Sequence, residues 1–338
     1  MPTTTINGFT LQYDVIGGGE PILLTPGGRG GMAQMRPLAE QLASAGYRAI
    51  IWDRRNCGAS DVVIDGGVSE QEHNADEAFE LLTRLDATPA YACAGTSGMR
   101  AMALRGRGVE RHGVAIDVDP GASLLLAIRH PQAVKGVLLT AVTGWPVGAQ
   151  YLAENYYTCY VEAAQRGGMR AVIEQLAPNQ APDEEPFWAA RIRENPRNEQ
   201  RVLSMDPQHF IRVMESWSAF TLRESYICGV TKEQLAAIRV PTLAIGGGDD
   251  EHPTYVAERV TDVVPGAEFH PPVITALERL RLANRDFRDD AAPAVERMEE
   301  LRSERTLAIL LQFLARVGSG AAKPPGGQPA VADVAYQW

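Results

Sequence analysis

The sequence lacks the features of membrane, exported and nucleic-acid-binding proteins. No apolar run in its 338 residues approaches the roughly 20 residues that a membrane-spanning helix needs. The N-terminus has neither a basic start nor the apolar stretch of an export signal. Positive charge is in deficit, with 32 lysines and arginines against 42 acidic residues, whereas a duplex-binding protein needs clustered positive charge. We therefore expect a cytoplasmic protein that binds neither nucleic acid nor membrane.

Cysteine is also scarce, and the sequence holds no metal motif. The four cysteines (Cys57, Cys93, Cys159 and Cys228) are widely spaced and form no CxxC pair. A disulfide framework or a structural zinc site needs closer clustering. There is no HExxH motif, no close Cys/His cluster and no GxGxxG fingerprint. We expect free thiols, no metal and no cofactor.

Short apolar runs alternate with amphipathic segments along the chain. Asn7-Gly8 predicts the turn of a hairpin over residues 3–15. Ser69 and Glu72 have the spacing of a capping box and predict the start of a helix. Further helices are predicted over 35–45 and 122–128, and further strands over 21–25, 48–52, 90–94, 134–142, 240–246 and, more weakly, 267–274. This alternation predicts an α/β fold with a mostly parallel central sheet and helices on both of its faces.

One long stretch interrupts this pattern. Residues 144–237 have no strand signal and carry aromatic residues at helical spacing, so we expect a helical cap inserted into a core of residues 1–143 and 238–316. Residues 317–338 are rich in glycine, proline and alanine, which predicts a flexible tail.

A second interruption follows residue 98. Residues 99–120 are basic and glycine-rich, and they predict an irregular insertion. Either a helix starts over residues 98–104 and residues 106–120 loop out, or the helix begins near Gly121.

Two glycine-containing turns each follow a predicted buried strand. Gly95-Thr96-Ser97-Gly98 is typical of a nucleophile on a sharp strand-to-helix turn, where small neighbours permit strained backbone. Gly95 is small as this pattern requires, whereas Met99 is not; Ser97 as a simple helix cap is the alternative. The other turn, residues 26–31, is glycine-rich enough to bring backbone N–H groups close to a substrate oxygen, although a plain glycine turn is the alternative. We expect Ser97 to be a nucleophile and the N–H groups of Gly28 and Gly98 to form an oxyanion hole.

The remaining members of a Ser–His–acid site must come from later in the chain. Such a site needs an imidazole that accepts the serine proton and a carboxylate that orients the imidazole. Asp249 follows a predicted strand and is the expected acid, with Asp250 and Glu251 as alternatives in register. His270 ends another strand segment and is the expected base. His252, only three residues after Asp249, is the alternative base, and a chain without a competent base is the third interpretation.

The motifs, and the order in which they follow one another along the chain, resemble those of the α/β-hydrolase superfamily over about residues 8–315. Pro26-Gly27-Gly28 resembles the family's oxyanion loop, and Gly95-Thr96-Ser97-Gly98 resembles its nucleophile elbow. Residues 53–60 resemble the family's Asp-x-Arg-Gly-x-Gly-x-Ser turn, with Asn56 in place of glycine. Residues 129–139 resemble the end of the family's helix and the strand after it, and residues 240–249 resemble the strand that presents the acid. The loop lacks the family's usual histidine, and the elbow lacks its last small residue.

The resemblance implies a cofactor-independent serine hydrolase that acts on an ester-like or C–C bond of a small, largely apolar molecule. Ser97 would attack, His270 would relay the proton and Asp249 would orient the imidazole. Asp53-Arg54-Arg55 with the Gly-Gly loop also resembles proline iminopeptidases, so an aminopeptidase is an alternative. A catalytically silent binding protein of the same fold is the other alternative. The sequence makes no prediction of oligomeric state.

Overall fold

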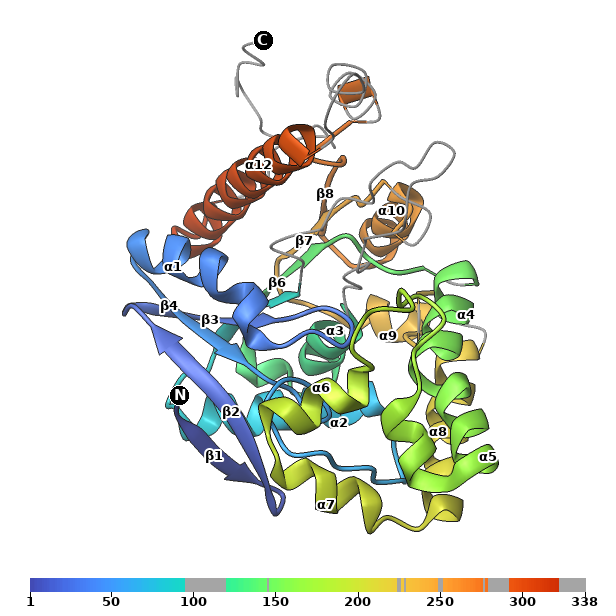
Figure 1. Cartoon of the computed structure of the whole chain (residues 1–338). Coiled ribbons are helices and arrows are strands. Elements are labelled where there is room, and N and C mark those ends of the chain that lie inside the picture. The colour runs from blue at the N-terminus through green and yellow to red at the C-terminus, as the bar shows by residue number, and fades with distance from the viewer. Residues whose placement is uncertain are drawn as a thin grey trace.

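The chain is built on one mostly parallel sheet. The computed structural model describes residues 1–94, 120–144, 146–223, 226–227, 229–248, 252–275, 277–278 and 292–321. Eight strands pair in the order β1-β2-β4-β3-β5-β6-β7-β8 (Figure 1). The strands are β1 (Thr3–Ile6), β2 (Phe9–Ile16), β3 (Glu20–Thr25), β4 (Tyr47–Trp52), β5 (Ala90–Ala94), β6 (Val134–Thr140), β7 (Thr242–Ile245) and β8 (Glu268–His270). The β1–β2 and β2–β4 pairs are antiparallel, and the other five pairs are parallel.

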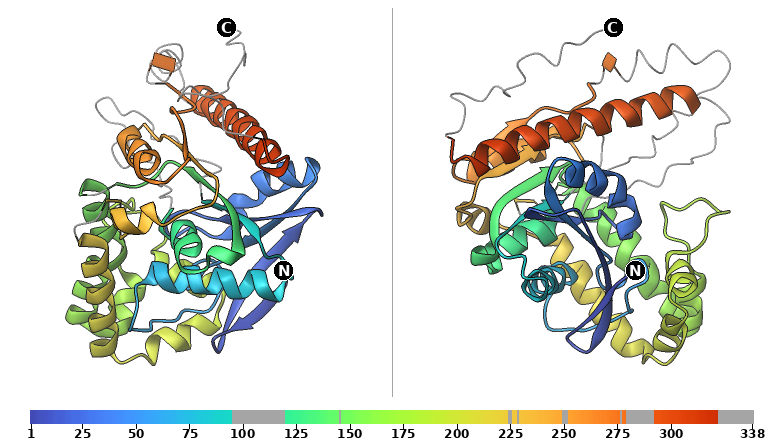
Figure 2. Two further views of the ribbon diagram at one scale, coloured as in Figure 1. Left: turned by 180° about the vertical axis from the view of Figure 1, so that it is seen from behind. Right: turned by 90° about the vertical axis from the view of Figure 1, so that its left-hand side faces the viewer.

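Helices cover both faces of this sheet. On one face α1 (Arg36–Ser44) and α12 (Ala292–Gly318) pack over apolar side chains such as Ile22, Ile51 and Leu138. The opposite face carries α2 (Glu70–Arg84), α3 (Pro120–Arg129), α9 (Lys232–Ala236) and α10 (Thr254–Val263), which pack over side chains such as Leu23 and Ile50. Figure 2 shows α12 lying along α1, on the side of the sheet away from α2 and α3. Short 3-10 helices precede α1 (Met32–Met35) and β6 (Pro131–Ala133).

Residues 147–222 form a separate group of helices, which we call the cap helices. They are α4 (Val147–Ala153), the π-helix η3 (Glu154–Thr158), α5 (Cys159–Glu174), α6 (Phe187–Glu194), α7 (Arg197–Leu203) and α8 (Pro207–Leu222). They enclose their own apolar cluster, which includes Trp217 and Phe210 and into which Val62 and Ile64 insert from the connection between β4 and α2. By contrast, Leu235 of α9 packs with the sheet. The predicted boundaries of core and cap stay predictions.

The sequence pattern anticipated most of these elements. Asn7 and Gly8 have φ values of 48° and 83°, as the tight turn between β1 and β2 requires. Ser69 and Glu72 form the reciprocal hydrogen bonds of a capping box at the start of α2, as predicted. The last strand is an exception: it ends at His270 and not at residue 274, because two prolines follow it and cannot donate to a sheet ladder.

Several predictions lie outside the described residues. They are the elbow at residues 95–98, the arrangement of residues 99–119 and the tail beyond residue 321. Helix α12 continues through residues 317 and 318, the first two residues of the predicted tail. None of the helices in the described ranges is both long and apolar enough to cross a bilayer.

Replacing Gly58 by alanine tests the turn after β4. Gly58 has φ of +52°, and an added Cβ would lie 2.2 Å from Asp53 Cγ. We expect the free energy of unfolding of Gly58→Ala, measured by urea denaturation, to fall by about 2–4 kcal/mol, because backbone strain and a steric clash combine. Gly46→Ala is the matched control, since Gly46 has φ of +91° and open space around the added Cβ. Equal losses in the two variants would contradict the described packing of Asp53 against this turn.

Candidate active site

The predicted site residues follow strands whose carboxyl ends share one edge of the sheet. Thr25, the last residue of β3, pairs with Ala94, the last residue of β5. Ile245 and His270 pair in the same way at the ends of β7 and β8. The carboxyl edge of a parallel sheet is where ligands bind in open α/β folds. Gly28 and His270 are among the described residues of this edge, whereas Ser97, Gly98, Asp249, Asp250 and Glu251 lie outside them.

The glycine loop after β3 is a tight turn with fixed carbonyl groups. The Gly30 N–H donates to Gly27 O at 3.0 Å, and Gly28 has φ of +48°, a conformation that favours glycine. The buried guanidinium of Arg54 donates to Gly28 O and, at 3.4 Å, to Gly27 O. In a planar trans peptide the N–H points opposite to the carbonyl, so the Gly28 N–H points away from Arg54. Among the described residues no acceptor takes this N–H, which leaves it able to donate to an oxyanion.

Asp53 joins this loop to the turn after β4. Its carboxylate accepts hydrogen bonds from Met32 N at 2.6 Å and from Ala59 N at 2.9 Å. Burial raises the pKa of Asp53 to about 6, although these two N–H groups oppose the shift. The carboxylate therefore couples the end of the glycine loop to residues 53–60, the turn that resembles the family motif.

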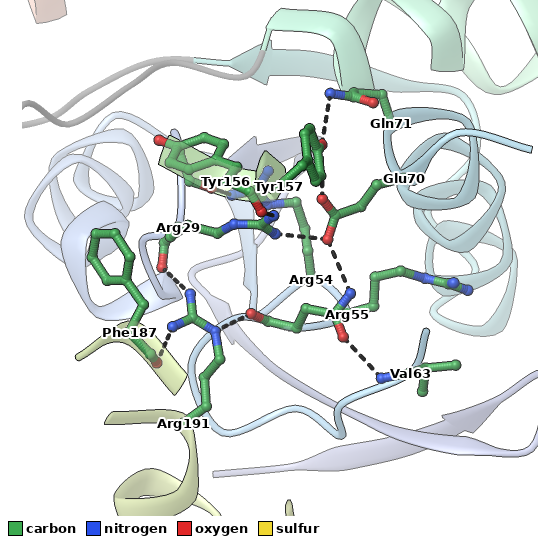
Figure 3. Close-up of polar contacts among 12 residues, drawn as sticks. Arg29, Arg54, Arg55, Val63, Glu70, Gln71, Tyr156, Tyr157, Phe187 and Arg191 are labelled. Atoms are coloured by element: carbon green, nitrogen blue, oxygen red, sulfur yellow. Dashed lines mark hydrogen bonds and ion pairs between the residues drawn. The ribbon is translucent and has the colours of Figure 1, made fainter. Parts of the chain in front are cut away.

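Arg29 extends from the glycine loop into a buried ion pair. Its guanidinium lies 2.7 Å from the carboxylate of Glu70, the first residue of α2, and donates to Tyr156 O at 3.1 Å (Figure 3). It also lies over the rings of Tyr156 and Tyr157, with its central carbon 4.8 and 5.5 Å from their centroids. Both tyrosines belong to the π-helix η3, an element that often marks functional sites. The loop next to Gly28 is thus fastened to the cap helices.

Glu70 is held in its charged form by this cluster. Burial opposes the charge, but Arg29 and hydrogen bonds from Asn56 Nδ2 at 2.9 Å and Tyr157 Oη at 3.0 Å lower the pKa of Glu70 to about 2. Burial also works against the charge on Arg29, yet the nearby Glu70 raises the pKa of this guanidinium further above its usual value. The pair is therefore fully ionised at neutral pH.

A second arginine reaches the glycine loop from the cap helices. Arg191 of α6 donates through Nη2 to Arg29 O at 3.0 Å, through Nε to Asn56 O and through Nη1 to Phe187 O (Figure 3). Its side chain is buried. One guanidinium therefore binds backbone carbonyls of three segments: the glycine loop, the turn after β4 and α6.

His270 lies at the expected edge and in a form suited to a base. Its Nδ1 lies 2.6 Å from Pro271 O, and because a carbonyl only accepts, Nδ1 carries the proton and Nε2 keeps its lone pair. No described residue hydrogen-bonds to Nε2, and the ring is buried. Burial lowers the pKa of His270, so the imidazole is neutral at neutral pH.

The position of His270 sets a requirement on the loops. Strands β6 and β7 separate β8 from β5, the strand that precedes Ser97, so three strand spacings of about 14 Å in all lie between them. The described residues therefore place His270 beside β7, which precedes the predicted acid, and three strands away from β5, which precedes the predicted nucleophile. A Ser97–His270 hydrogen bond requires the segments after the strands to cross this width.

His252 lies next to Gly248, and residues 249–251 come between these two in the sequence. Gly248 N donates to His252 O at 2.8 Å, so both ends of the segment holding Asp249 are fixed. His252 is buried. The histidine and the predicted acid are thus close in the sequence, and the acid lies outside the described residues.

Sequence reasoning missed the residues that hold the glycine loop. Arg29, Glu70, Tyr157 and Arg191 form a polar cluster beside the glycine loop. The sequence analysis assigned no role to Arg29, Glu70 or Arg191. Arg29 carried one usable signal, since a charged residue in a glycine-rich loop after a buried strand needs a partner. The partners could not be identified, because Glu70 and Arg191 lie 41 and 162 positions away in sequence.

The described residues form no cluster of metal-binding side chains. Within the described ranges, no three His, Cys, Asp or Glu side chains gather as metal ligands. Cys57, Cys93 and Cys159 are free buried thiols, as expected, and Cys228 lies outside the described residues.

Comparison with known proteins agrees with this architecture. No protein-family model matches the chain. A protein from Azorhizobium caulinodans described as the carbamate hydrolase RutD is 26% identical over 80% of this chain and 88% of its own. A proline iminopeptidase from Lacticaseibacillus rhamnosus is 25% identical over 78% of this chain and 86% of its own. Among solved structures, the enol-lactonase from Burkholderia xenovorans is 16% identical, with a TM-score of 0.52 over 93% of this chain and all of its own.

The sheet topology and these relatives place the chain in the α/β-hydrolase superfamily, a class of hydrolytic enzymes. A protein described as the non-haem bromoperoxidase BpoC from Mycobacterium tuberculosis shares the fold, with 21% identity and a TM-score of 0.52 over 93% of this chain and 97% of its own.

Replacing Glu70 by glutamine tests the buried ion pair. Because the pKa of Glu70 is about 2 in the folded chain and 4.5 otherwise, its stabilisation is complete above pH 4.5 and is lost as the pH falls below that value. We expect Glu70→Gln to lower the free energy of unfolding at pH 7 by up to about 3 kcal/mol, with the gap to the wild type narrowing below pH 4.5. Urea titrations across this pH range measure both.

The control is Glu40→Gln, since Glu40 is an exposed glutamate of α1. It should change stability little at any of these pH values. A Glu70→Gln gap that stays constant down to pH 3.5 would contradict the assigned ion pair.

Proposed function

We propose that the protein is a cofactor-independent serine hydrolase that uses Ser97, His270 and Asp249 as a catalytic triad. The N–H groups of Gly28 and Gly98 stabilise the oxyanion in this proposal. The observation that carries it is the glycine loop: Arg54 holds the carbonyls of Gly27 and Gly28, so the Gly28 N–H points away from the buried side without an acceptor among the described residues. A backbone donor at the carboxyl edge next to β5 is what acyl transfer at Ser97 needs.

The reaction follows from these roles. His270 Nε2 takes the hydroxyl proton of Ser97 as the oxygen attacks the substrate carbonyl, and the carbonyl oxygen gains negative charge between the two N–H donors. The imidazolium then gives the proton to the leaving group, and an acyl-enzyme forms. Water, deprotonated in the same way, releases the acid and regenerates Ser97. Because the Nδ1–H of His270 donates to Pro271 O, Asp249 stabilises the imidazolium through its negative charge in both halves of the reaction.

The substrate we propose is a small, largely apolar molecule with an ester-like or C–C bond. Tyr156 and Tyr157 of the cap helices lie against Arg29 of the glycine loop, and Trp217 packs against Tyr157 behind them. Apolar walls are typical of small-molecule sites. The named activities of the two relatives with the same fold, carbamate and lactone hydrolysis, involve carbonyl carbons of the ester type.

The first experiment replaces the proposed nucleophile. Ser97→Ala should fold with wild-type stability and lose at least about 10³-fold in turnover of short-chain p-nitrophenyl esters, since only the oxyanion hole and binding remain. Ser44→Ala, at an exposed serine of α1, is the control and should retain full turnover. Wild-type turnover in Ser97→Ala would refute the proposal. Ester turnover absent from the wild-type protein would instead favour a catalytically silent binding protein.

An aminopeptidase is the second candidate, and the similarity to a proline iminopeptidase favours it. Comparing kcat/KM for p-nitrophenyl acetate and prolyl-p-nitroanilide separates the two. We expect the ester to be preferred by far. A preference for the prolyl amide would assign the protein to the peptidases while leaving Ser97 as the nucleophile.

The pH dependence of kcat/KM tests the base. Because burial lowers the pKa of His270, the neutral base persists below its ordinary pKa of 6.5 and activity should fall only as the pH drops further. His270→Ala should abolish this activity, whereas His252→Ala should keep it with the same profile. The reverse result would transfer the role to His252, and loss in neither variant would exclude both as bases.

A further inference from the structure

Arg191 is a buried cation whose side-chain hydrogen bonds all go to backbone carbonyls, and it also lies over the Phe187 ring. Its side chain bonds to Phe187 in its own helix, to Asn56 in the turn after β4 and to Arg29 in the glycine loop. Within the described ranges no carboxylate lies within ion-pair distance of it, unlike Arg29 and Arg55. Burying a charge costs free energy unless hydrogen bonds replace its lost hydration. The planar guanidinium presents its donors in a rigid fork, and three carbonyl oxygens accept hydrogen bonds from it. The contacts of Arg191 thus define geometry and do not neutralise a charge.

The glycine loop is therefore held from two sides. Arg54 takes the carbonyls of Gly27 and Gly28, and Arg191 takes the next carbonyl along the chain, that of Arg29. Each carbonyl belongs to a planar peptide, so fixing it also fixes the direction of the N–H that follows. Since Arg54 belongs to the turn after β4 and Arg191 to the cap helices, the orientation of the loop depends on both parts of the molecule.

We propose that Arg191 is a positioning residue for the oxyanion hole, an inference that rests on the proposed function. It touches no reacting atom. It holds the Arg29–Gly30 peptide, whose N–H donates to Gly27 O at 3.0 Å, and the Gly27 carbonyl shares its planar peptide with the Gly28 N–H. Through this hydrogen bond Arg191 keeps the direction of the Gly28 N–H. A donor aimed at developing charge contributes most in the transition state. Loss of Arg191 therefore lowers kcat and leaves KM nearly unchanged.

The test compares Arg191→Ala and Arg191→Lys with a matched arginine of the cap helices. Arg201 of α7 bonds to Asp61 at 2.8 Å and, within the described ranges, forms no hydrogen bond or ion pair with the glycine loop, so Arg201→Ala is the control. We expect kcat for a p-nitrophenyl ester to fall about 10- to 100-fold in both Arg191 variants, less than the roughly 10²- to 10³-fold cost of removing an oxyanion donor, because the donor is displaced and not removed. Arg201→Ala should keep kcat within about twofold, because an ion pair with a partly exposed partner contributes little free energy.

Chemical rescue separates positioning from a general structural role. Added guanidinium at low millimolar concentration should restore part of the kcat of Arg191→Ala, because it can occupy the vacated fork between the three carbonyls. It should not restore Arg191→Lys, whose side chain fills the space. Affinity for a boronic acid, which becomes a tetrahedral anion on Ser97, should fall in parallel with kcat. An unchanged kcat or boronate affinity in Arg191→Ala, or a fall in kcat without rescue, would overturn the inference.

Hydrogen–deuterium exchange keeps the inference testable apart from the proposed function. Peptides spanning residues 27–31 should exchange faster in Arg191→Ala and Arg191→Lys than in Arg201→Ala, whether or not the protein hydrolyses esters. Unchanged exchange in that segment would refute the positioning role directly. Wild-type protein without Ser97-dependent turnover would refute the proposed function. If exchange over residues 27–31 still rises in the Arg191 variants, the conclusion that Arg191 holds the glycine loop would remain supported.

Discussion

The site depends on a single constraint: the glycine loop after β3 is fastened through its carbonyl groups to buried guanidinium groups. A loop of glycines is free to adopt many conformations, and this freedom has to be removed before its N–H groups can point at a substrate oxygen. Arg54 restrains the loop from the turn after β4 and Arg191 restrains it from α6. Side-chain contacts of Arg29 with Glu70 and Tyr157 then anchor the same loop to α2 and η3.

The contacts of Arg29 and Arg191 link the cap helices directly to the glycine loop of the proposed site. Asn198 of α7 accepts from Val62 N at 2.8 Å and donates to Ser60 O at 3.1 Å, and Trp217 of α8 donates to Val68 O at 3.0 Å. The connection between β4 and α2 therefore lies under the cap helices with its polar groups satisfied by them. Removing these helices would expose buried acceptors as well as apolar surface, so we expect the sheet to need them for stability as well as for selectivity.

Local pattern was enough to predict the strands of the sheet and helices α1, α2 and α3, because most of the strands are short apolar runs with glycine or proline beside them. Helices α10 and α12 were not predicted. The end of β8 was misjudged because the apolar character continues past His270, whereas Pro271 and Pro272 cannot extend the ladder. The cluster around Arg29 could not be predicted, because its members are scattered along the chain and only the folded sheet brings Glu70 and Arg191 to the loop. The roles of Ser97 and Asp249 stay predictions from motif and order.

The central claim is that Ser97 is an activated nucleophile beside a preformed oxyanion hole. Treating the protein with a fluorophosphonate probe, followed by mass-spectrometric mapping of the modified peptide, tests it most directly, because the probe reacts with serines whose oxyanion hole accepts the phosphonyl oxygen. We expect one adduct per chain, located on Ser97. An unlabelled protein under conditions that fully label a known serine hydrolase, or an adduct on another residue, would contradict it.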